Sequence, residues 1–242
     1  MNFEEYERMN QFEVVNWWWA GKRQLVARTL GKLVGNKPLI LDVGCGTGSN
    51  LKGWEPFGDV LGMDISTQAL DFCKIKGNSN LVKGDATALP FHDNTFEVII
   101  ALDMLEHMEK DSATVKEFSR ICRQGGYLVI TVPALMFLWS KHDVALHHKR
   151  RYAREELRKL LSSNGFKVER LTFWNFSLFL PASFYRVLGN LKPPKQARSD
   201  DLRLPGPANW FFKSILHLEN TAILNGLNFP CGISLYAVCR KA

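Results

Sequence analysis

Short hydrophobic runs alternate with longer amphipathic stretches along most of this chain. Residues 39–43 form an apolar run ended by glycines, as expected of a strand buried on both faces of a parallel sheet. Similar runs predict six further strands, at 60–63, 80–82, 96–101, 127–132, 167–173 and 233–239. A helical pattern at 153–164 ends with Asn164 and Gly165 as its C-cap. The alternation predicts an α/β fold built on a seven-stranded, mostly parallel sheet with helices on both faces.

Two stretches outside this alternation predict helical additions. Apolar residues recur at roughly helical spacing through 11–35, which predicts one helix lying over the core. Residues 176–229 hold an apolar run, a polar linker with prolines from Lys192 to Leu204, and a second helical pattern, which predicts a cap or an interface element. We divide the chain, as one domain of residues 1–242, into a helical cover (1–36), a core (37–175), a helical insertion or cap (176–229) and the last strand (230–242).

Composition narrows the class of protein only slightly. Hydrophobic residues make up 46% and charged residues 23% of the chain, a globular balance, and the formal charge of +7 does not by itself indicate nucleic acid. The five cysteines are scattered without a CxxC pair, which argues against zinc and disulfides and favours a reducing compartment. The N-terminus lacks a signal-peptide pattern, and no apolar run reaches the roughly 20 residues that a membrane span needs. We therefore expect a soluble, cytoplasmic protein without a metal.

The segment 41–48, LDVGCGTG, carries the strongest local signal. A strand that ends in glycines and opens a helix lets a ligand approach the backbone closely, because the β-carbons are missing. A dinucleotide fingerprint would place its third glycine at Ser49, whereas here it stands one residue earlier, at Gly48, which disfavours NAD. Asp64, at the end of the second strand, is suited to accept both ribose hydroxyls; its alternative role is a helix N-cap.

Further motifs follow in register: Gly84-Asp85-Ala86 before Leu89-Pro90-Phe91, and the segment 103–107, DMLEH. With the glycine turn, they resemble the class I methyltransferases that use S-adenosylmethionine (SAM), in particular a type 11/12-like branch, from about residue 37 to 132. The resemblance implies a Rossmann-like three-layer sandwich with an antiparallel last strand, SAM as cofactor and S-adenosylhomocysteine as product. The residues that it assigns to the cofactor are Asp42, Gly44, Cys45, Gly46, Gly48, Asp64, Ile65, Asp85, Ala86, Leu102 and Asp103.

Residues 17–23, WWWAGKR, resemble a leader segment of a bacterial and archaeal branch of the same enzymes. That resemblance implies that Arg23, or its neighbour Lys22, closes over SAM. An aromatic helix face packed on the core, with both cations in solvent, explains the same residues equally well.

The loop after the fifth strand is expected to face the acceptor of the methyl group. His142, Asp143 and His148 are therefore candidates for a general base or for orienting the substrate. In the alternative interpretation, Asp143 and the neighbouring arginines form ion pairs that fix the loop, and Tyr152 starts the next helix. Arg150 and Arg151 could also hold an anionic group of the substrate.

We expect a small, lipid-linked or saccharide-linked acceptor that is methylated on oxygen, because the apolar stretch 173–188 lies close in sequence to this polar loop. A nucleic-acid partner is not expected, since residues 102–105, LDML, lack the Asn/Asp-Pro-Pro-aromatic segment used on bases. A nucleic-acid or protein N-methyltransferase and a noncatalytic SAM-binding module remain the alternatives. Peripheral membrane contact and the choice between monomer and homodimer stay open.

Overall fold

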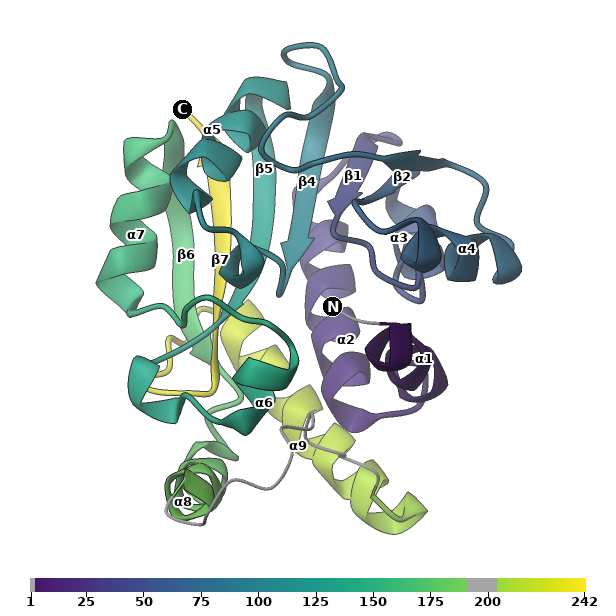
Figure 1. Ribbon diagram of the computed structural model, residues 1–242. Coiled ribbons are helices and arrows are strands. Elements are labelled where there is room, and N and C mark those ends of the chain that lie inside the picture. Colours follow the sequence, from purple (N-terminus) through teal and green to yellow (C-terminus); the bar gives the residue numbers. More distant parts are fainter. Residues whose placement is uncertain (1–2, 191–203) are drawn as a thin grey trace.

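The computed structural model describes residues 3–190 and 204–242 as a seven-stranded sheet with helices packed around it (Figure 1). The strands are β1 (Leu39–Val43), β2 (Asp59–Asp64), β3 (Leu81–Lys83), β4 (Phe96–Leu102), β5 (Cys122–Pro133), β6 (Phe166–Trp174) and β7 (Ser234–Lys241). The helices are α1 (Phe3–Phe12), α2 (Trp17–Leu33), α3 (Leu51–Trp54), α4 (Thr67–Ile75), α5 (Asp111–Ile121), α6 (Lys141–Ala145), α7 (Arg154–Ser163), α8 (Phe179–Asn190) and α9 (Gly206–Leu224). Short 3-10 turns are η1 (Glu55–Phe57), η2 (Leu105–His107) and η3 (Met136–Leu138).

The strands lie in the order β3-β2-β1-β4-β5-β7-β6. Neighbours from β3 to β5 pair in parallel, and β7 pairs antiparallel with both β5 and β6. The predicted α/β fold, with its mostly parallel sheet and antiparallel last strand, is therefore confirmed. Six of the seven predicted strands differ from the observed ones by two residues or fewer at each end, whereas β5 begins five residues early, at Cys122.

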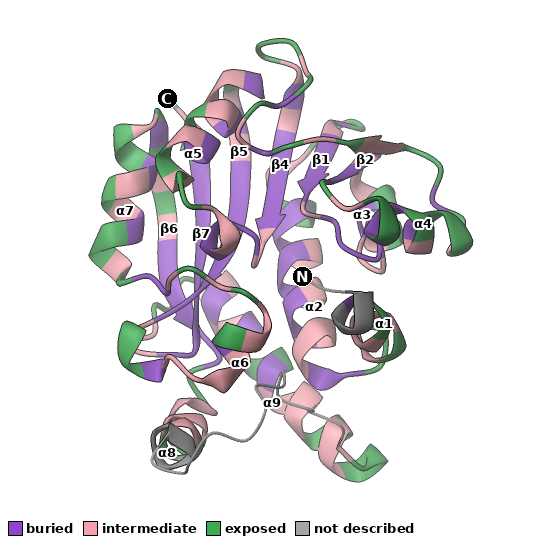
Figure 2. Ribbon diagram, viewed as in Figure 1, coloured by how far each residue is buried: buried purple, intermediate pink, exposed green. Residues whose placement is uncertain are grey.

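Two apolar cores lie on opposite faces of the sheet, as the alternation of side chains along each strand requires. In β4, Ile99 packs with the helices α5 and α7, whereas Val98 and Ile100 pack on the face covered by α2, α3 and α9. Figure 2 shows the central strands almost wholly buried. This double burial explains why the strands read as continuous apolar runs in the sequence.

The single helix predicted at 11–35 is wrong in detail, because the chain forms α1 and α2 with a turn between them. Asn16 is extended, with φ −67° and ψ 136°, and its side chain accepts a hydrogen bond from the Trp18 amide. An asparagine in this conformation is a helix N-cap, so a new helix begins at Trp17. Val15, which fitted the helical spacing, is exposed in the turn.

Residues after β6 form the helices α8 and α9, whereas the polar linker predicted at 192–204 lies outside the described residues except for Leu204. The helix α9 packs along α2, where a β-carbon on Gly21 would approach Leu216 Cδ1 to 2.4 Å. The predicted helix at 153–164 is confirmed as α7, with Asn164 as its C-cap and Gly165 at φ +90°. Within the described part of the chain, no helix has the length and apolar character needed to cross a membrane.

Candidate active site

A cavity of about 390 Å³ opens at the carboxyl ends of the central strands. It lies where the strand order reverses between β1 and β4, the place at which open α/β sheets bind their ligands. Segments following β1, β2, β3, β4 and β5 line it, together with α1, α2, α6 and α8. A cavity of this size suits a small organic molecule.

The glycine turn after β1 takes left-handed backbone conformations, with φ +74° at Gly44, +56° at Gly46 and +79° at Gly48. Gly44 and Gly46 line the cavity, whereas Gly48 is not among the described lining residues. A β-carbon on Gly48 would lie 2.7 Å from Cys73 Sγ on α4. We therefore assign Gly48 to packing of the turn against α4, and Gly44 and Gly46 to the ligand side.

Two carboxylates, Asp42 and Asp64, lie buried at the ends of neighbouring strands. Asp42 accepts a hydrogen bond of 2.8 Å from Trp54 Nε1, and burial raises its pKa to about 7. Asp64 accepts from the Gly46 and Ser66 amides, each at 2.9 Å, and burial raises its pKa too. Neither carboxylate forms an ion pair with another described residue. The arrangement suits a ligand that brings a cation and hydroxyl groups.

Asp64 does not take the alternative role of helix cap. The N-cap of α4 is Ser66, whose side chain accepts from the Ala69 amide, while Asp64 lies two residues earlier on the cavity wall. Each carboxylate oxygen can accept a second hydrogen bond, so the two backbone bonds leave capacity for ribose hydroxyls.

The other residues assigned to the cofactor also come together. Cys45, Ile65, Asp85, Ala86, Leu102 and Asp103 all line the cavity. Asp85 is exposed at the rim, and its Oδ1 accepts from the backbone and hydroxyl of Thr87, which lowers the pKa of the Asp85 carboxyl. Ile65 is also exposed and follows the neighbouring strand β2, so that an apolar and an acidic side chain flank the opening.

The helix α2 presents Lys22, and not Arg23, to the cavity. Lys22 is buried, pairs with the carboxylate of Asp103, and lies 5.4 Å from the ring centre of Trp18. Burial lowers the pKa of Lys22 to about 7. Arg23 instead bonds to Asn50 and to the backbone carbonyls of residues 13 and 14, and it is absent from the described lining residues.

On the other side of the cavity, Asp143 holds together the loop after β5. It is fully buried, and its Oδ1 accepts from Arg151 Nε at 2.8 Å and from His148 Nδ1 at 2.9 Å. Burial opposes ionisation, but the His148 hydrogen bond and the Arg151 charge keep the pKa of Asp143 well below its usual range. These contacts support the ion-pair interpretation for Asp143, so it positions other groups.

His142 and His148 both line the cavity, with ring centres 6.3 Å apart. Since Asp143 holds Nδ1 of His148, its Nε2 is the atom left for a ligand. Burial lowers the pKa of His142 to about 3, with a further contribution from the charge of Arg186. A neutral imidazole of low pKa is suited to hydrogen bonding and is a weak proton acceptor.

Arg150 and Tyr152 do not take the roles predicted for them. Arg150 bonds to Asp111 Oδ2 at 2.8 Å and is not among the described residues of the cavity wall. Tyr152 lies ahead of α7, fully buried, and its hydroxyl also reaches Asp111, at 3.0 Å. Arg151 does line the cavity, but it bonds to Asp143 and to the carbonyl of Ala134.

Several lining residues were not predicted from the sequence as members of the site: Tyr6, Met9 and Phe12 of α1, and Glu106 and His107 of η2. A β-carbon on Gly46 would lie 2.6 Å from Met9 Cε, so α1 packs directly over the glycine turn. Glu106 is fully buried, and burial raises its pKa to about 8 against the opposing charges of Lys22 and Arg151. The DMLEH motif contained Glu106, but only the folded loop shows what faces it.

Comparisons with known proteins agree with the fold. Residues 41–130 match the family model described as "Methyltransferase domain". The demethylmenaquinone methyltransferase of Staphylococcus aureus is 34% identical over 137 residues, which cover 52% of this chain and 54% of that protein. The chain thus spans about half the length of the curated relatives that it matches.

Two solved structures have the same fold. A SAM-dependent methyltransferase from Archaeoglobus fulgidus aligns with a TM-score of 0.57 at 21% identity, covering 90% of this chain and 94% of that one. A SAM-dependent methyltransferase from Mesorhizobium loti aligns with a TM-score of 0.58 at 15% identity, covering 89% and 96%. The predicted resemblance to class I SAM-dependent methyltransferases is therefore confirmed in the fold and in the segment that carries the glycine turn.

Proposed function

We propose that this chain binds SAM in the cavity and transfers its methyl group to the oxygen of a small, lipid-like acceptor. The observation that carries the proposal is the pair of buried carboxylates, Asp42 and Asp64, beside a glycine turn at the switch point of the sheet. SAM brings an ammonium group, a ribose with two hydroxyls and a sulfonium. The site offers carboxylates to the first two and backbone amides to the SAM carboxylate.

Within this proposal, Asp64 accepts the ribose hydroxyls and Asp42 holds the charge of the ammonium group. Asp85 and Ala86 contact the adenine, while Leu102 and Asp103 contact the methionine part. Methyl transfer is an in-line displacement that depends on alignment of the two reactants. The protein's main task is therefore to hold the acceptor oxygen opposite the sulfonium.

The acceptor enters from the side of α6 and α8 in this proposal. His148, held through Asp143, and His142 orient the acceptor hydroxyl there. Apolar side chains on the two helices of the insertion lie exposed: Leu180 and Phe184 on α8, and Trp210, Phe211 and Leu218 on α9. They offer a lipid tail a surface, and a peripheral contact with membranes follows from the same proposal. The relative from Staphylococcus aureus, named for demethylmenaquinone, supports a small lipid-like acceptor.

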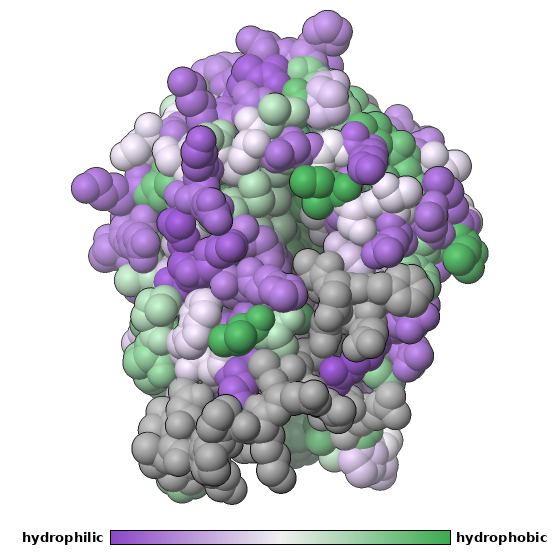
Figure 3. Space-filling view, in the orientation of Figure 1, coloured by the Kyte–Doolittle hydropathy of each residue, from purple (hydrophilic) through white to green (hydrophobic). Residues whose placement is uncertain are grey.

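Among the residues coloured in Figure 3, hydrophilic ones predominate, with hydrophobic residues between them in small patches. A lipid-like acceptor therefore depends on the local surface of α8 and α9 and not on a broadly apolar molecule. Sedimentation of the purified protein distinguishes a monomer from a homodimer.

Calorimetric titration with SAM, S-adenosylhomocysteine and NADH tests the cofactor. We expect micromolar binding of the first two and none of NADH. Incubation with SAM labelled by ¹³C in its methyl group, together with either a lipid extract or a water-soluble extract, then tests the acceptor. The ¹³C shift of the product methyl distinguishes oxygen, nitrogen and carbon. Label found in nucleic acid or protein, or tight SAM binding without any transfer, would contradict the proposed acceptor.

A further inference from the structure

Among the described residues, no group lies in hydrogen-bond geometry to the carboxyl oxygens of Glu106. The residue lies in η2 after β4 and is fully buried on the cavity wall. Neither Oε1 nor Oε2 accepts a hydrogen bond from a described group. Buried carboxylates in native proteins are normally paired, hydrogen-bonded or bound to a metal ion. Lys22 of α2, whose charge acts on Glu106, forms its hydrogen bond with Asp103.

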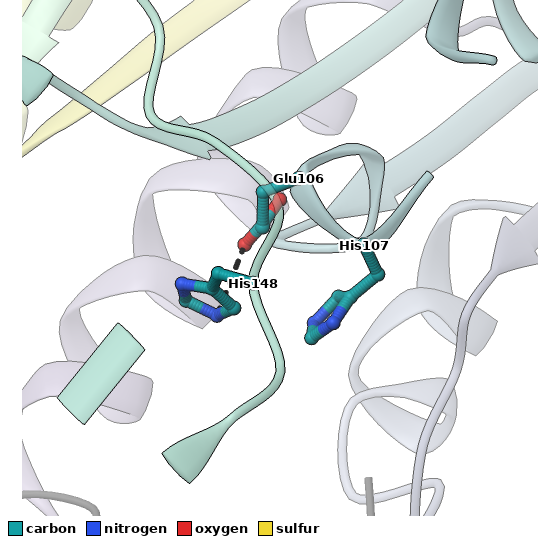
Figure 4. Close-up of side chains that lie close together, drawn as sticks. All are labelled: Glu106, His107 and His148. Atoms are coloured by element: carbon teal, nitrogen blue, oxygen red, sulfur yellow. Dashed lines mark ion pairs between the residues drawn. The ribbon is translucent and has the colours of Figure 1, made fainter. Parts of the chain in front are cut away.

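Two imidazoles lie beside this carboxyl group (Figure 4). His148 places Nε2 at 3.8 Å from Glu106 Oε1, which is too long for a hydrogen bond. The ring of His107 lies edge-on to that of His148, with centres 4.9 Å apart. One ligand atom each from Glu106, His107 and His148 falls within a group in which all lie within 4.8 Å of one another.

Each histidine is also fixed through a second contact. Nδ1 of His148 bonds to Asp143 Oδ1 at 2.9 Å, and the ring of His107 interacts with the backbone of His147. Histidines that bind metal ions almost always use the other ring nitrogen in this way, with a carboxylate or a backbone carbonyl as partner. The contacts orient both rings before any ligand arrives.

The distances fit one ion with a small adjustment. Two donor atoms that each lie about 2.1 Å from a zinc ion are at most about 4.2 Å apart. The 3.8 Å between His148 Nε2 and Glu106 Oε1 satisfies this limit. The three ligand atoms all lie within 4.8 Å of one another, so binding of one ion requires any longer pair to close by at most about 0.6 Å. Two imidazoles and one carboxylate are a donor set that Zn²⁺, Fe²⁺ and Mn²⁺ accept, with further positions left for a ligand.

We propose that Glu106, His107 and His148 bind one divalent transition-metal ion on the acceptor side of the cavity. All three residues line the cavity, so the positions that they leave open face the space in which an acceptor binds. Nothing in the sequence patterns predicted this site, because the two loops that form it are some forty residues apart.

The role of the ion rests on the proposed function. A hydroxyl oxygen bound to it loses its proton to solvent more readily, since the ion stabilises the oxyanion. The oxyanion then forms a bond to the SAM methyl carbon, the carbon–sulfur bond breaks, and its electron pair remains on sulfur to give S-adenosylhomocysteine. His142 and His148 then need not remove the proton themselves, in keeping with the neutral, hydrogen-bonding character of the His142 ring.

Metal binding can be measured without SAM or an acceptor. Untagged protein, stripped by chelation and dialysed, is titrated with Zn²⁺ in a calorimeter and with Co²⁺ in a spectrophotometer, where ligation by nitrogen shifts the visible bands. We expect one ion per chain. Glu106→Gln, His107→Ala and His148→Ala should each weaken binding at least tenfold, whereas His92→Ala, at an exposed histidine, should leave it unchanged.

Circular dichroism and SAM titration identify variants that fail to fold, and with three independent ligand variants the site stays testable if one of them fails. Absence of a stoichiometric ion in folded protein that binds SAM would overturn the metal site and leave the proposed function intact. Equal Zn²⁺ affinity in wild type and in folded Glu106→Gln and His148→Ala would also overturn it. If the ion binds but SAM does not, the proposed function fails and the metal site stands.

Discussion

Lys22 on α2 forms an ion pair with Asp103, which directly follows β4 and lies 81 positions further along the chain. The other oxygen of Asp103, Oδ1, accepts from the Thr131 hydroxyl at 2.8 Å, and the residue takes a left-handed φ of +49°. A non-glycine residue in this conformation is held by its surroundings and is often part of a functional site. The helix that covers the sheet is thus connected to the strand end where the methionine part of SAM is expected.

The two neighbouring cations of α2 should differ in their effect on SAM affinity. We expect Lys22→Met to weaken SAM binding about tenfold, or about 1.4 kcal/mol, because Asp103 loses the partner that fixes its side chain. Arg23→Met should change the affinity less than about threefold, since Arg23 bonds to Asn50 and to the turn after α1 and is not among the described lining residues. Calorimetry on both variants gives the comparison. A larger loss in Arg23→Met would restore the role that the sequence resemblance implied for Arg23.

Asp64 should be needed both for SAM binding and for the glycine turn. In Asp64→Ala the amides of Gly46 and Ser66 lose their acceptor, and hydrogen bonds to a charged group contribute about 1.5–3 kcal/mol each. We expect a clear fall in thermal stability and loss of SAM binding at micromolar concentrations. Asp64→Asn keeps one side-chain oxygen that can accept a backbone hydrogen bond. This variant should therefore retain more of the thermal stability than of the SAM affinity.

Asp59→Asn is a matched control, because Asp59 lies exposed at the opposite end of the same strand. Thermal stability and SAM affinity should both stay at the wild-type level in Asp59→Asn. Unchanged SAM affinity in folded Asp64→Ala would exclude Asp64 as the ribose acceptor.

The central strands β1, β4, β5 and β7 could be predicted because they are buried on both faces and so leave continuous apolar runs, whereas the edge strands β3 and β6 are only partly buried. The break between α1 and α2 could not, since Val15 and Trp18 keep the helical spacing across it and only Asn16 signals a new start. The acids at the strand ends followed from topology, because parallel strands end at one edge of the sheet. Gly48 fitted the cofactor motif equally well, yet its contacts are with α4.

Helix geometry could not have distinguished Lys22 from Arg23. Residues four apart lie on one helix face, and Trp18 and Trp19, which precede the two cations by four positions, both line the cavity. Glu106 could not be assigned from the sequence either, because the groups that face it come from the loop around His148, and no local pattern relates the two segments. Such long-range encounters depend on the tertiary structure.

SAM affinity should depend on pH through Asp42. Burial holds the pKa of Asp42 at about 7 in the free protein, so the carboxyl is largely protonated at pH 6. Binding of the SAM ammonium favours the carboxylate and must release that proton. Affinity should therefore rise up to about pH 7, then fall once the SAM amine deprotonates at a pKa near 8.

Calorimetry at pH 6 in buffers of different ionisation enthalpy measures the released proton directly, and Asp42→Asn should release none. The stability of the fold depends on pH in the opposite direction to the affinity for SAM. Because the folded-state pKa is raised, the contribution of Asp42 to stability is complete below about pH 3.8 and is lost as the pH rises through about 7. SAM that binds with equal proton release in wild type and Asp42→Asn would exclude Asp42 as the source.

The two histidines of the loop after β5 should affect methyl transfer and not SAM binding. His148 and His142 lie on the side of the cavity opposite the glycine turn, where the acceptor is expected. We expect His148→Ala and His142→Ala each to lower turnover at least tenfold, about 1.4 kcal/mol of transition-state stabilisation, with SAM affinity within about threefold of wild type. Removing His148 leaves Asp143 bonded to Arg151 and Ser140, so the loop should keep its fold.

Turnover of labelled SAM with the acceptor fraction, measured beside SAM calorimetry on the same preparations, separates the two effects. His92→Ala is the matched control, because this histidine is exposed and is not among the described residues of the cavity wall. Full turnover in both loop variants would remove the histidines from the reaction. A loss of SAM affinity as large as the loss of turnover would instead assign them to the cofactor, because a residue that acts on the acceptor alone leaves the binding of SAM unchanged.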